Sequence, residues 1–497
     1  MNLTTDAWIP ALRADGTRAI FGLHDLFAEA HTLRDLAVKP HEKIALMRLV
    51  LCITQAALDG PSNEDEWLDC RDEIQPKVRA YLEKWRASFE LFGEGPRFLQ
   101  LSNLHPGKET DEGNAITKLD LALATGNNST LFDNGAGEGR RVVAARAALN
   151  LLTFQCFSPG GRIGVVRWNG KDTPGKGSSN HAPCTPSSML HTLVLGKSLL
   201  ETIARNLLTK DLVSATIVKG WGRPAWELAV KSTEDFAAVE NATLTYLGRL
   251  VPHSRAIRLN ETGENILLGN GLDYPIFPAY REATATVVVR KDEPGLLPAS
   301  TGRGIWRQLH AITVKRRSDS EGTAGPLALG LNSFRHDSGL WIGAFVTDKA
   351  KIEDLLEATY NVPPALFEPF GRAAYESGVK HADARESGLM KAIGSYASAL
   401  KIDGPAYDRA RQNFWTRVEQ SLGDLFTVAR ELTPPEKLAT SRWGHAVRSA
   451  AREAYERSCP RRTPRQIQAY ALGLRHLFMS DKPSKSATPA KTKKSAE

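Results

Sequence analysis

One loop of the sequence contains residue types that bind phosphate groups in nucleotide-hydrolysing proteins. The run from Gly170 to Lys176 has the spacing G-x-x-x-x-G-K, in which backbone N–H groups and the lysine contact phosphates. That pattern also requires a Ser or Thr directly after the lysine to hold Mg²⁺, and Gly177 stands there instead. Pro183 and Pro186 follow where the motif needs a helix. We therefore expect no nucleotide hydrolysis.

Histidines and cysteines are the next candidates for chemistry. None of the 12 histidines falls into HExxH or HxH spacing. His181 and His191 lie near Cys184 in the sequence, but loop histidines are more commonly satisfied by solvent or backbone than by a metal. The five cysteines form no C-x-x-C pair, which favours reduced cytoplasmic thiols over a zinc site or disulfide framework. With no G-x-S-x-G elbow and no distinctive carboxylate pair, we predict no catalytic residues, no cofactor and no metal.

The positive charge of the chain is concentrated near its C-terminus. The chain carries a net charge of +8, and the segment from Ser441 to Glu497 alone has 13 basic and four acidic residues. The preceding residues are therefore nearly neutral. A basic segment of this kind suits a phosphate backbone, although a solvated surface is an equally simple explanation.

Membrane insertion and secretion have no support in the sequence. No stretch approaches the ~20 uninterrupted apolar residues that a membrane-spanning helix needs. The first residues, Met1 to Trp8, show no basic region followed by an apolar one. We expect a cytoplasmic protein that does not bind membranes.

At 497 residues, the chain is too long for one compact core, and its first part predicts a mixed fold. Apolar spacing predicts helices over His41 to Leu58 and Glu64 to Phe92. Between about residues 101 and 186, glycine-rich runs indicate long loops. Short β-branched runs then predict strands at Thr192–Leu195, Thr286–Val289 and Ala311–Val314.

From about Thr347 onward, the pattern is helical. Apolar residues recur at steps of three and four from Phe414 to Leu432, and the run ends at Pro434-Pro435. Further helices are predicted in four segments: Lys351–Tyr360, Ala384–Leu400, Arg442–Tyr455 and Pro464–Met479. We predict an α+β protein with a large mixed domain over 1–346, small sheets and long loops included, and a four-helix bundle over 347–480. A disordered basic tail over 481–497 completes the chain.

Several short motifs resemble a known family when they are taken in order. They are Asn2-Leu3-x-x-Asp6-x-Trp8-Ile9-Pro10, Leu23-His24-Asp25-Leu26-Phe27, the run from Leu36 to Leu46, and Pro96-Arg97-Phe98-Leu99-Gln100. In this order and spacing the chain resembles the large subunit of type I-E Cascade, the CRISPR surveillance complex (CasA, a Cas8-type protein). The resemblance in layout extends over nearly the whole chain.

This resemblance implies a non-catalytic subunit of a larger complex. In the family, the large subunit recognises the protospacer-adjacent motif (PAM) on duplex DNA, promotes local strand opening and recruits a separate nuclease-helicase. The protein reads the PAM, whereas base pairing with the guide reads the target. The implied partners are guide RNA, target double-stranded DNA, the other Cascade subunits and the nuclease-helicase.

The resemblance also implies which residues approach DNA. Arg290 and Lys291 end a run, Val287-Val288-Val289-Arg290-Lys291, that matches the family's lysine finger in spacing; a cation on a strand end can enter the minor groove. His336 stands where the family's wedge hairpin carries a glutamine. Pro159-Gly160-Gly161 and Gly164 correspond to a glycine loop, since glycine allows close approach of the backbone. Ordinary turns remain an alternative for the His336 and glycine segments.

A further family loop contacts the 5′ end of the guide RNA and a neighbouring subunit. The resemblance assigns this role to Asn128, Leu131, Phe132 and Asp133, where the family's Phe-Val-Asn appears as Leu-Phe-Asp. The zinc-binding C-x-x-C of some members is replaced by Arg140-Arg141-Val142, so no zinc is expected. Three alternatives stay open: the large subunit of another type I system, a metal-dependent nuclease with an unrecognised site, and a general basic-tailed nucleic-acid binder.

Overall fold

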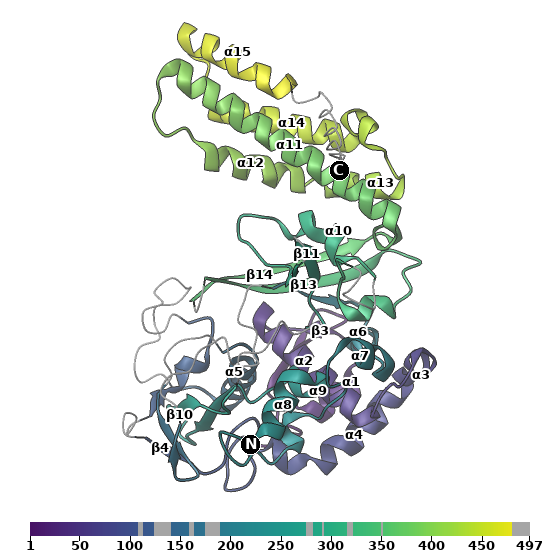
Figure 1. The fold of residues 1–497 in the computed structure, drawn as a ribbon, viewed down its shortest axis with the longest axis vertical. Coiled ribbons are helices and arrows are strands. Elements are labelled where there is room, and N and C mark those ends of the chain that lie inside the picture. Colours follow the sequence, from purple (N-terminus) through teal and green to yellow (C-terminus); the bar gives the residue numbers. More distant parts are fainter. Residues whose placement is uncertain are drawn as a thin grey trace, which may run out of the picture. The chain divides into compact units, whose positions relative to one another are not determined.

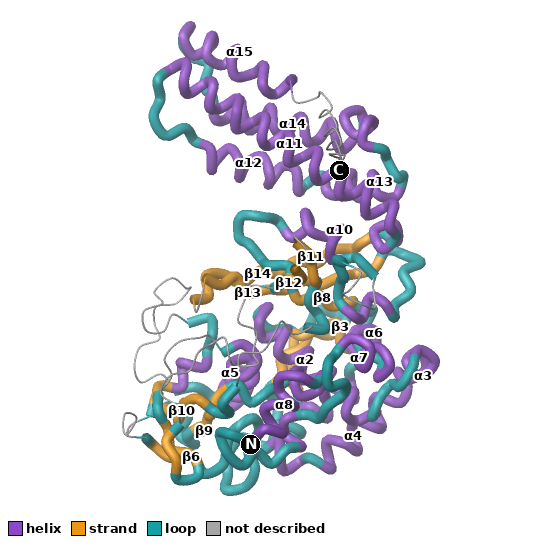
Figure 2. Tube along the Cα trace, viewed as in Figure 1, coloured by secondary structure: helices purple, strands orange, loops and turns teal. Residues whose placement is uncertain are grey.

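The computed structural model describes residues 1–107, 113–123, 141–158, 164–173, 189–274, 282–290, 293–315, 322–348 and 351–479 (Figure 1). The chain divides into two compact units, Met1–Val362 and Pro363–Glu497. The first unit mixes helices with small antiparallel sheets, and the second is helical (Figure 2). The α+β architecture predicted from the sequence is therefore confirmed.

The first unit is built from short elements. Its helices are α1 (Leu23–Glu29), α2 (Pro40–Leu58), α3 (Glu64–Asp69), α4 (Ile74–Lys84), α5 (Ala144–Phe157), α6 (Leu199–Asn206), α7 (Lys210–Thr216), α8 (Phe236–Leu244), α9 (Tyr246–Leu250) and α10 (Leu309–Ile312). Its strands are β1 (Ile9–Arg13), β2 (Arg18–Phe21), β3 (Leu33–Leu36), β4 (Leu104–Pro106), β5 (Asn114–Ala115), β6 (Val166–Trp168), β7 (Lys171–Asp172), β8 (His191–Val194), β9 (Arg255–Leu259), β10 (Asn265–Asn270), β11 (Val287–Arg290), β12 (Glu293–Leu296), β13 (Ser338–Asp348) and β14 (Lys351–Val362). The strand orders are β2-β1-β3, β5-β10-β9, β11-β12, β14-β13-β8 and β4-β6-β7.

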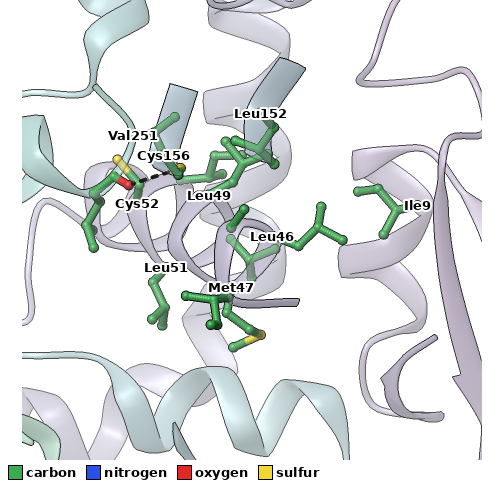
Figure 3. Close-up of a cluster of buried hydrophobic side chains, with 14 of the residues drawn as sticks. Ile9, Leu46, Met47, Leu49, Leu51, Cys52, Leu152, Cys156 and Val251 are labelled. Carbon is green, nitrogen blue, oxygen red and sulfur yellow. Dashed lines mark hydrogen bonds between the residues drawn. The ribbon is translucent and has the colours of Figure 1, made fainter. Parts of the chain in front are cut away.

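Helix α2 is the centre of the first unit. Every residue from His41 to Gln55 is buried, so the helix is covered on all sides. Leu46, Met47 and Leu49 leave the helix in different directions toward other elements of the core (Figure 3). Burying each such side chain contributes about 1.5–3 kcal/mol, which explains why an apolar run of this length becomes a core helix.

The buried thiols belong to the same packing. Cys52 on α2 lies against the carbonyl oxygen of Leu247, and Cys156 on α5 lies against that of Leu250. Burial raises the pKa of the Cys52 thiol well above its ordinary value. The four cysteines in the described part of the chain are buried, so they pack as small apolar side chains.

The second unit consists of α11 (Pro369–Leu400), α12 (Tyr407–Glu419), α13 (Leu422–Arg430), α14 (Arg442–Ser458) and α15 (Pro464–Met479). The long helix α11 packs against α13, α14 and α15, and α12 packs against α14. Gly378 permits one of these contacts, because a Cβ there would lie 2.4 Å from Leu425 Cδ1. Trp443 Nε1 donates to the Gly378 carbonyl oxygen at 2.9 Å, which fixes α14 on α11.

Two predicted elements have the wrong type. The segment Lys351–Tyr360, predicted as a helix, belongs to strand β14, which pairs with β13 along its whole length. In this antiparallel pair, Val362 lies opposite Ser338 and Lys351 lies opposite Asp348. Tertiary pairing overrides a composition rich in helix formers. As a result, the predicted domain change at residues 346–347 falls within β13. The segment Ala311–Val314, predicted as a strand, continues helix α10, and the Thr313 hydroxyl donates back to the Leu309 carbonyl oxygen at 2.8 Å.

Two other predicted helices are interrupted. The segment Glu64–Phe92 contains α3, α4 and short 3₁₀ turns, because Pro76 has no N–H and its ring excludes a continuous helix through the preceding turn. The apolar stripe from Phe414 to Leu432 spans α12 and α13, with a break at Gln420 and Ser421. Counted as one interrupted helix, α12 and α13 complete the predicted four-helix arrangement with α11, α14 and α15.

Candidate nucleic-acid interface

The predicted finger strand is present as β11. Val287 to Arg290 pairs with Leu296 to Glu293 in a two-stranded hairpin, and Pro294 is tolerated because β12 lies at an edge. Three consecutive valines favour this extended conformation. Arg290 is the last residue of the strand, as its sequence position predicted, whereas Lys291 lies outside the described residues.

The base of the hairpin is held by backbone contacts on two sides. Val287 exchanges hydrogen bonds with Ala324, at 2.8 and 2.9 Å. On the other side, Ala285 bridges to His191 at the start of β8, and the Thr192 N–H donates to the Thr284 carbonyl oxygen at 2.9 Å. The base of the hairpin is therefore held by the first unit on both sides.

A buried ion pair fixes the same base to the core helix. Glu282, which precedes β11 in the chain, accepts a hydrogen bond from Arg48 of α2. Arg249 Nε lies 3.6 Å from the other carboxylate oxygen of Glu282. Burial by itself would raise the pKa of Glu282, but Arg48 and Arg249 outweigh it and hold that pKa below its ordinary value. The carboxylate is thus charged and paired inside the protein.

His191, which was considered for a metal site with His181 and Cys184, is a core residue. Its Nδ1 lies 2.9 Å from Thr284 Oγ1, and burial lowers its pKa to about 4. His181 and Cys184 lie outside the described residues. Within the ranges that the structure describes, no group of three or more His, Cys, Asp or Glu side chains is placed to hold a metal ion.

The predicted wedge residue lies at the tip of an exposed turn. Arg335, His336 and Asp337 are exposed, and the following strand β13 begins at Ser338. The Ser338 hydroxyl donates to the His336 carbonyl oxygen at 3.1 Å, which closes the turn. A planar imidazole at this position is accessible to a nucleic-acid base.

Asn332 and Arg205 brace this turn from below. The Asn332 side chain is 5 % exposed; its amide donates to the carbonyl oxygens of Arg205 and Ala328, both at 2.8 Å. In return, Arg205 Nε donates to Asn332 Oδ1 at 3.0 Å, and Arg205 Nη1 donates to the Leu195 carbonyl oxygen at 2.7 Å. The hydrogen bonds of Asn332 and Arg205 therefore fix the residues that precede the exposed turn at His336.

Cations surround the aromatic side chain under the turn. The ring of Phe334 has the Arg205 guanidinium 5.9 Å and the Lys315 ammonium 5.4 Å from its centroid. Burial lowers the pKa of Arg205, which nevertheless stays charged near neutral pH. Together with Arg335, these cations suit a phosphate backbone next to His336.

The finger hairpin and the His336 turn leave the sheet at opposite ends of β8. Leu340 pairs with Val194, so His336, earlier in the chain, lies beyond the Val194 end. Ala285 pairs antiparallel with His191, so β11 continues beyond the His191 end. The structure therefore joins the two predicted elements through one strand but does not bring them to one point.

The remaining predicted residues lie mainly beyond the described ranges. Gly160 and Gly161 are among them, as are Asn128, Leu131, Phe132 and Asp133. Gly164 is described and half-buried, and its carbonyl oxygen lies 3.1 Å from the position that a Cβ on Gly269 would take. The backbone after the glycine run therefore passes close to β10.

The two ends of the predicted guide-RNA segment are anchored by charged residues that sequence reasoning missed. Arg146 on α5 bonds to Glu42 of α2 at 2.6 Å and to Asp120 at 3.1 Å. Burial would raise the pKa of Asp120, but Lys39 and Arg146 hold it below its ordinary value. At the other end, Arg141 Nε donates to the Thr262 carbonyl oxygen at 2.9 Å. Only Arg141 is close enough in sequence to the motif for spacing to have indicated it.

Comparison with known proteins decides the family. The family model for CRISPR-associated protein Cse1 matches residues 2–454. The chain belongs to the Cse1 family. This result confirms the resemblance to the Cascade large subunit on which the sequence prediction was based.

Proteins of known structure share this fold over nearly their whole length. The CasA/Cse1 protein of Thermus thermophilus is 28% identical over 421 residues, covering 80% of this chain and 78% of its own. The crystal structure of Thermobifida fusca Cse1 aligns with a TM-score of 0.76 at 22% identity, covering 97% of both chains. A chain of a CRISPR RNA-guided surveillance complex aligns with a TM-score of 0.72 at 17% identity, over 97% of this chain and 99% of that one.

No helix in the described part of the chain is long and apolar enough to cross a membrane.

Proposed function

We propose that this chain is the Cse1 subunit of an RNA-guided surveillance complex, in which it reads the PAM on duplex DNA, promotes local strand opening and recruits a separate nuclease-helicase. Family membership and the likeness to a chain of a CRISPR RNA-guided surveillance complex support the assembly. In this proposal, Arg290 and Lys291 enter the minor groove, and His336 stacks on the first base pair to be opened.

The observation that carries the proposal is the set of contacts that fixes the base of the candidate finger. Arg290 ends a strand whose base is fixed to β8, to Ala324 and, through Glu282, to Arg48 of the core helix. A side chain that recognises bases in a DNA groove benefits from a fixed base, because a flexible loop would lose conformational entropy when it binds. Gly160, Gly161 and Gly164 would let backbone approach the same duplex, and the segment with Asn128, Leu131, Phe132 and Asp133 would contact guide RNA.

The test uses the complete complex with Arg290→Ala/Lys291→Ala in this subunit. We expect the affinity for a PAM-bearing duplex to fall about ten- to a hundredfold, because one groove contact is worth about 1–3 kcal/mol. Binding to a single-stranded target, which needs no duplex opening, should stay nearly normal. Lys77→Ala/Lys219→Ala is the control, since both lysines are about half exposed and lie elsewhere on the unit.

Other outcomes would reject the proposal. Equal losses on duplex and single-stranded targets would reduce Arg290 and Lys291 to general phosphate contacts. PAM-independent binding with no loss in the variant would favour a general nucleic-acid binder. Cleavage of DNA by the isolated chain that depends on added Mg²⁺ or Mn²⁺ would favour a nuclease.

A further inference from the structure

The helical unit contains a polar groove between α12 and α14. Its volume is about 480 Å³. Its walls carry guanidinium, amide and carboxylate groups, among them those of Arg409, Gln412, Asn413, Arg417, Glu453 and Arg457. The seam between two packed helices is usually filled by apolar side chains, so a hollow with this lining is a distinct feature.

Small residues form the floor of the groove. Ala450 and Ala454 line it and are only 1 % and 2 % exposed. They are four residues apart on α14 and therefore lie on the same face of the helix. Because neither has a side chain beyond Cβ, they leave the space between the two helices open, and the polar side chains line the edges of the groove.

Among the described residues that line the groove, arginines outnumber carboxylates, and two of the arginines share Glu453. Glu453 Oε2 lies 3.5 Å from Arg417 Nε on α12, and Glu453 Oε1 lies 2.6 Å from Arg457 Nη2. The side chains of Arg417 and Arg457 are 57% and 63% exposed, and that of Glu453 is 40% exposed. Exposed pairs of this kind are weak, so a phosphate group can replace the carboxylate between the two arginines at little cost.

The composition of the lining selects the kind of occupant. A docked protein segment would need apolar or aromatic anchors at the centre of its site. Nucleic-acid interfaces are instead polar and positively charged, and amide side chains such as Gln412 and Asn413 hydrogen-bond to bases and sugars. A duplex is too thick to enter a groove of this size.

We propose that the α12–α14 groove binds the sugar–phosphate backbone of a single-stranded nucleic acid, with Arg417 and Arg457 on phosphate and Glu453 as the group that the phosphate displaces. This site lies in the helical unit, apart from Arg290, Lys291 and His336 in the first unit, and it extends the proposed function to a strand that is not paired in a duplex.

The experiment measures binding of a fluorescein-labelled oligothymidylate to the full chain by anisotropy across a salt series. Arg417→Ala/Arg457→Ala should weaken binding about tenfold at low salt and reduce the salt slope by about 1.4, since each phosphate contact on a single strand contributes about 0.7. Glu453→Gln should have the opposite effect and strengthen binding severalfold, because it frees both arginines.

A matched control exists in the C-terminal half of α14 and just beyond its end. Arg452 and Arg461 share Glu456, at 3.1 and 3.7 Å, in the same way that the two groove arginines share Glu453. Arg452, Arg461 and Glu456 are not among the residues that line the groove. Arg452→Ala/Arg461→Ala and Glu456→Gln remove the same charges from similarly exposed positions. We expect them to change oligothymidylate binding by less than about twofold.

The results separate the possible occupants. Equal effects of the groove and control variants, or no effect of either, would overturn the proposal. If a labelled polyglutamate peptide lost binding in Arg417→Ala/Arg457→Ala while oligothymidylate binding stayed unchanged, the groove would belong to an acidic protein segment and the proposal would be wrong. The groove variants keep Arg290 and Lys291, and the Arg290→Ala/Lys291→Ala variant keeps Arg417 and Arg457, so failure of this proposal is distinguishable from failure of the proposed function.

Discussion

Arg48 and Glu282 form an ion pair in which each side chain is only 2% exposed. They lie 234 residues apart in the sequence and connect the core helix α2 with the root of strand β11. Arg48 also donates to the carbonyl oxygens of Leu250 and Arg249, at 2.7 and 2.6 Å, so each of its three guanidinium nitrogens donates a hydrogen bond. The position of the candidate finger therefore depends on a charge inside the core.

We predict that Arg48→Met lowers the free energy of unfolding by about 3–5 kcal/mol, because it leaves Glu282 charged and without its main partner. Urea denaturation of the full chain measures the loss. Adding Glu282→Gln should restore part of it, since the unpaired buried charge is then removed. Lys219→Met, which breaks the exposed pair with Glu240, is the control and should cost under about 1 kcal/mol. A loss that small for Arg48→Met would contradict the buried pair.

Buried histidines should make the first unit sensitive to acid. Burial lowers the pKa of His41, His191 and His253 to about 4. In the unfolded chain the same groups take up protons near pH 6.5. The folded state therefore loses stability as the pH falls from about 6.5 toward 4. The loss from Glu282 begins as the pH falls into the ordinary carboxyl range, because the unfolded chain takes up that proton before the folded one does.

The buried His253 provides the test. In this pH window, His253→Gln should reduce the slope of unfolding free energy with pH by up to about 1.4 kcal/mol per pH unit, the contribution of one proton. Urea denaturation at several pH values between 7.5 and 4.5 measures it. The exposed variant His336→Gln serves as the control and should leave the slope unchanged. An unchanged slope for His253→Gln would mean that His253 is protonated in the folded state.

Opening of the duplex should depend on His336 more than initial binding does. We predict that, in the assembled complex, His336→Ala slows separation of the first base pair beside the PAM about tenfold, because a wedge acts by stacking on the exposed pair. Fluorescence of 2-aminopurine at that pair measures the rate. Asn332→Ala should have a smaller effect in the same direction, since it removes the hydrogen bonds that brace the turn.

A target whose first pair is already mismatched supplies the control for this prediction. It needs no wedge, so it should restore a normal rate to His336→Ala. If the mismatch fails to restore the rate, His336 acts through stability or assembly rather than through strand opening.

The sequence predicts elements whose pattern is local. Helix α2 and strand β11 were predicted because an apolar run and three valines each favour one structure. The sequence did not predict strand β14, because Glu357 and its neighbours favour a helix. The segment is extended because it pairs with β13. The family resemblance indicated Arg290 and His336. It could not indicate Glu282 or Asn332, whose roles arise from partners distant in the sequence.

The basic C-terminal segment should contribute affinity without specificity. Residues 482–497 lie outside the described part of the chain, but their five lysines and single glutamate attract phosphate groups. We predict that deleting them weakens binding to non-target duplex severalfold and flattens its salt dependence, while the preference for PAM-bearing duplex stays unchanged. Competition binding with PAM and non-PAM duplexes measures both. A lost PAM preference would show that this segment takes part in recognition.

Helix α12 should be required for assembly of the helical unit. Val418 lies on this helix and is 0 % exposed. Val418→Pro removes a backbone donor and places the proline ring against the carbonyl group of the preceding turn, at a cost of about 3 kcal/mol or more. We expect lower helicity by far-UV circular dichroism and poor incorporation into the complex by size-exclusion chromatography.

Val418→Ala is the matched control, because it removes two methyl groups but keeps the backbone hydrogen bond. It should cost less than the proline and leave incorporation nearly normal. In the proposed function, β11 and the His336 turn read the PAM, so the fraction of the proline variant that does assemble should keep its PAM preference. Wild-type stability and assembly of Val418→Pro would contradict a packed role for this helix, whereas a lost PAM preference in the assembled fraction would show that the helical unit shares in recognition.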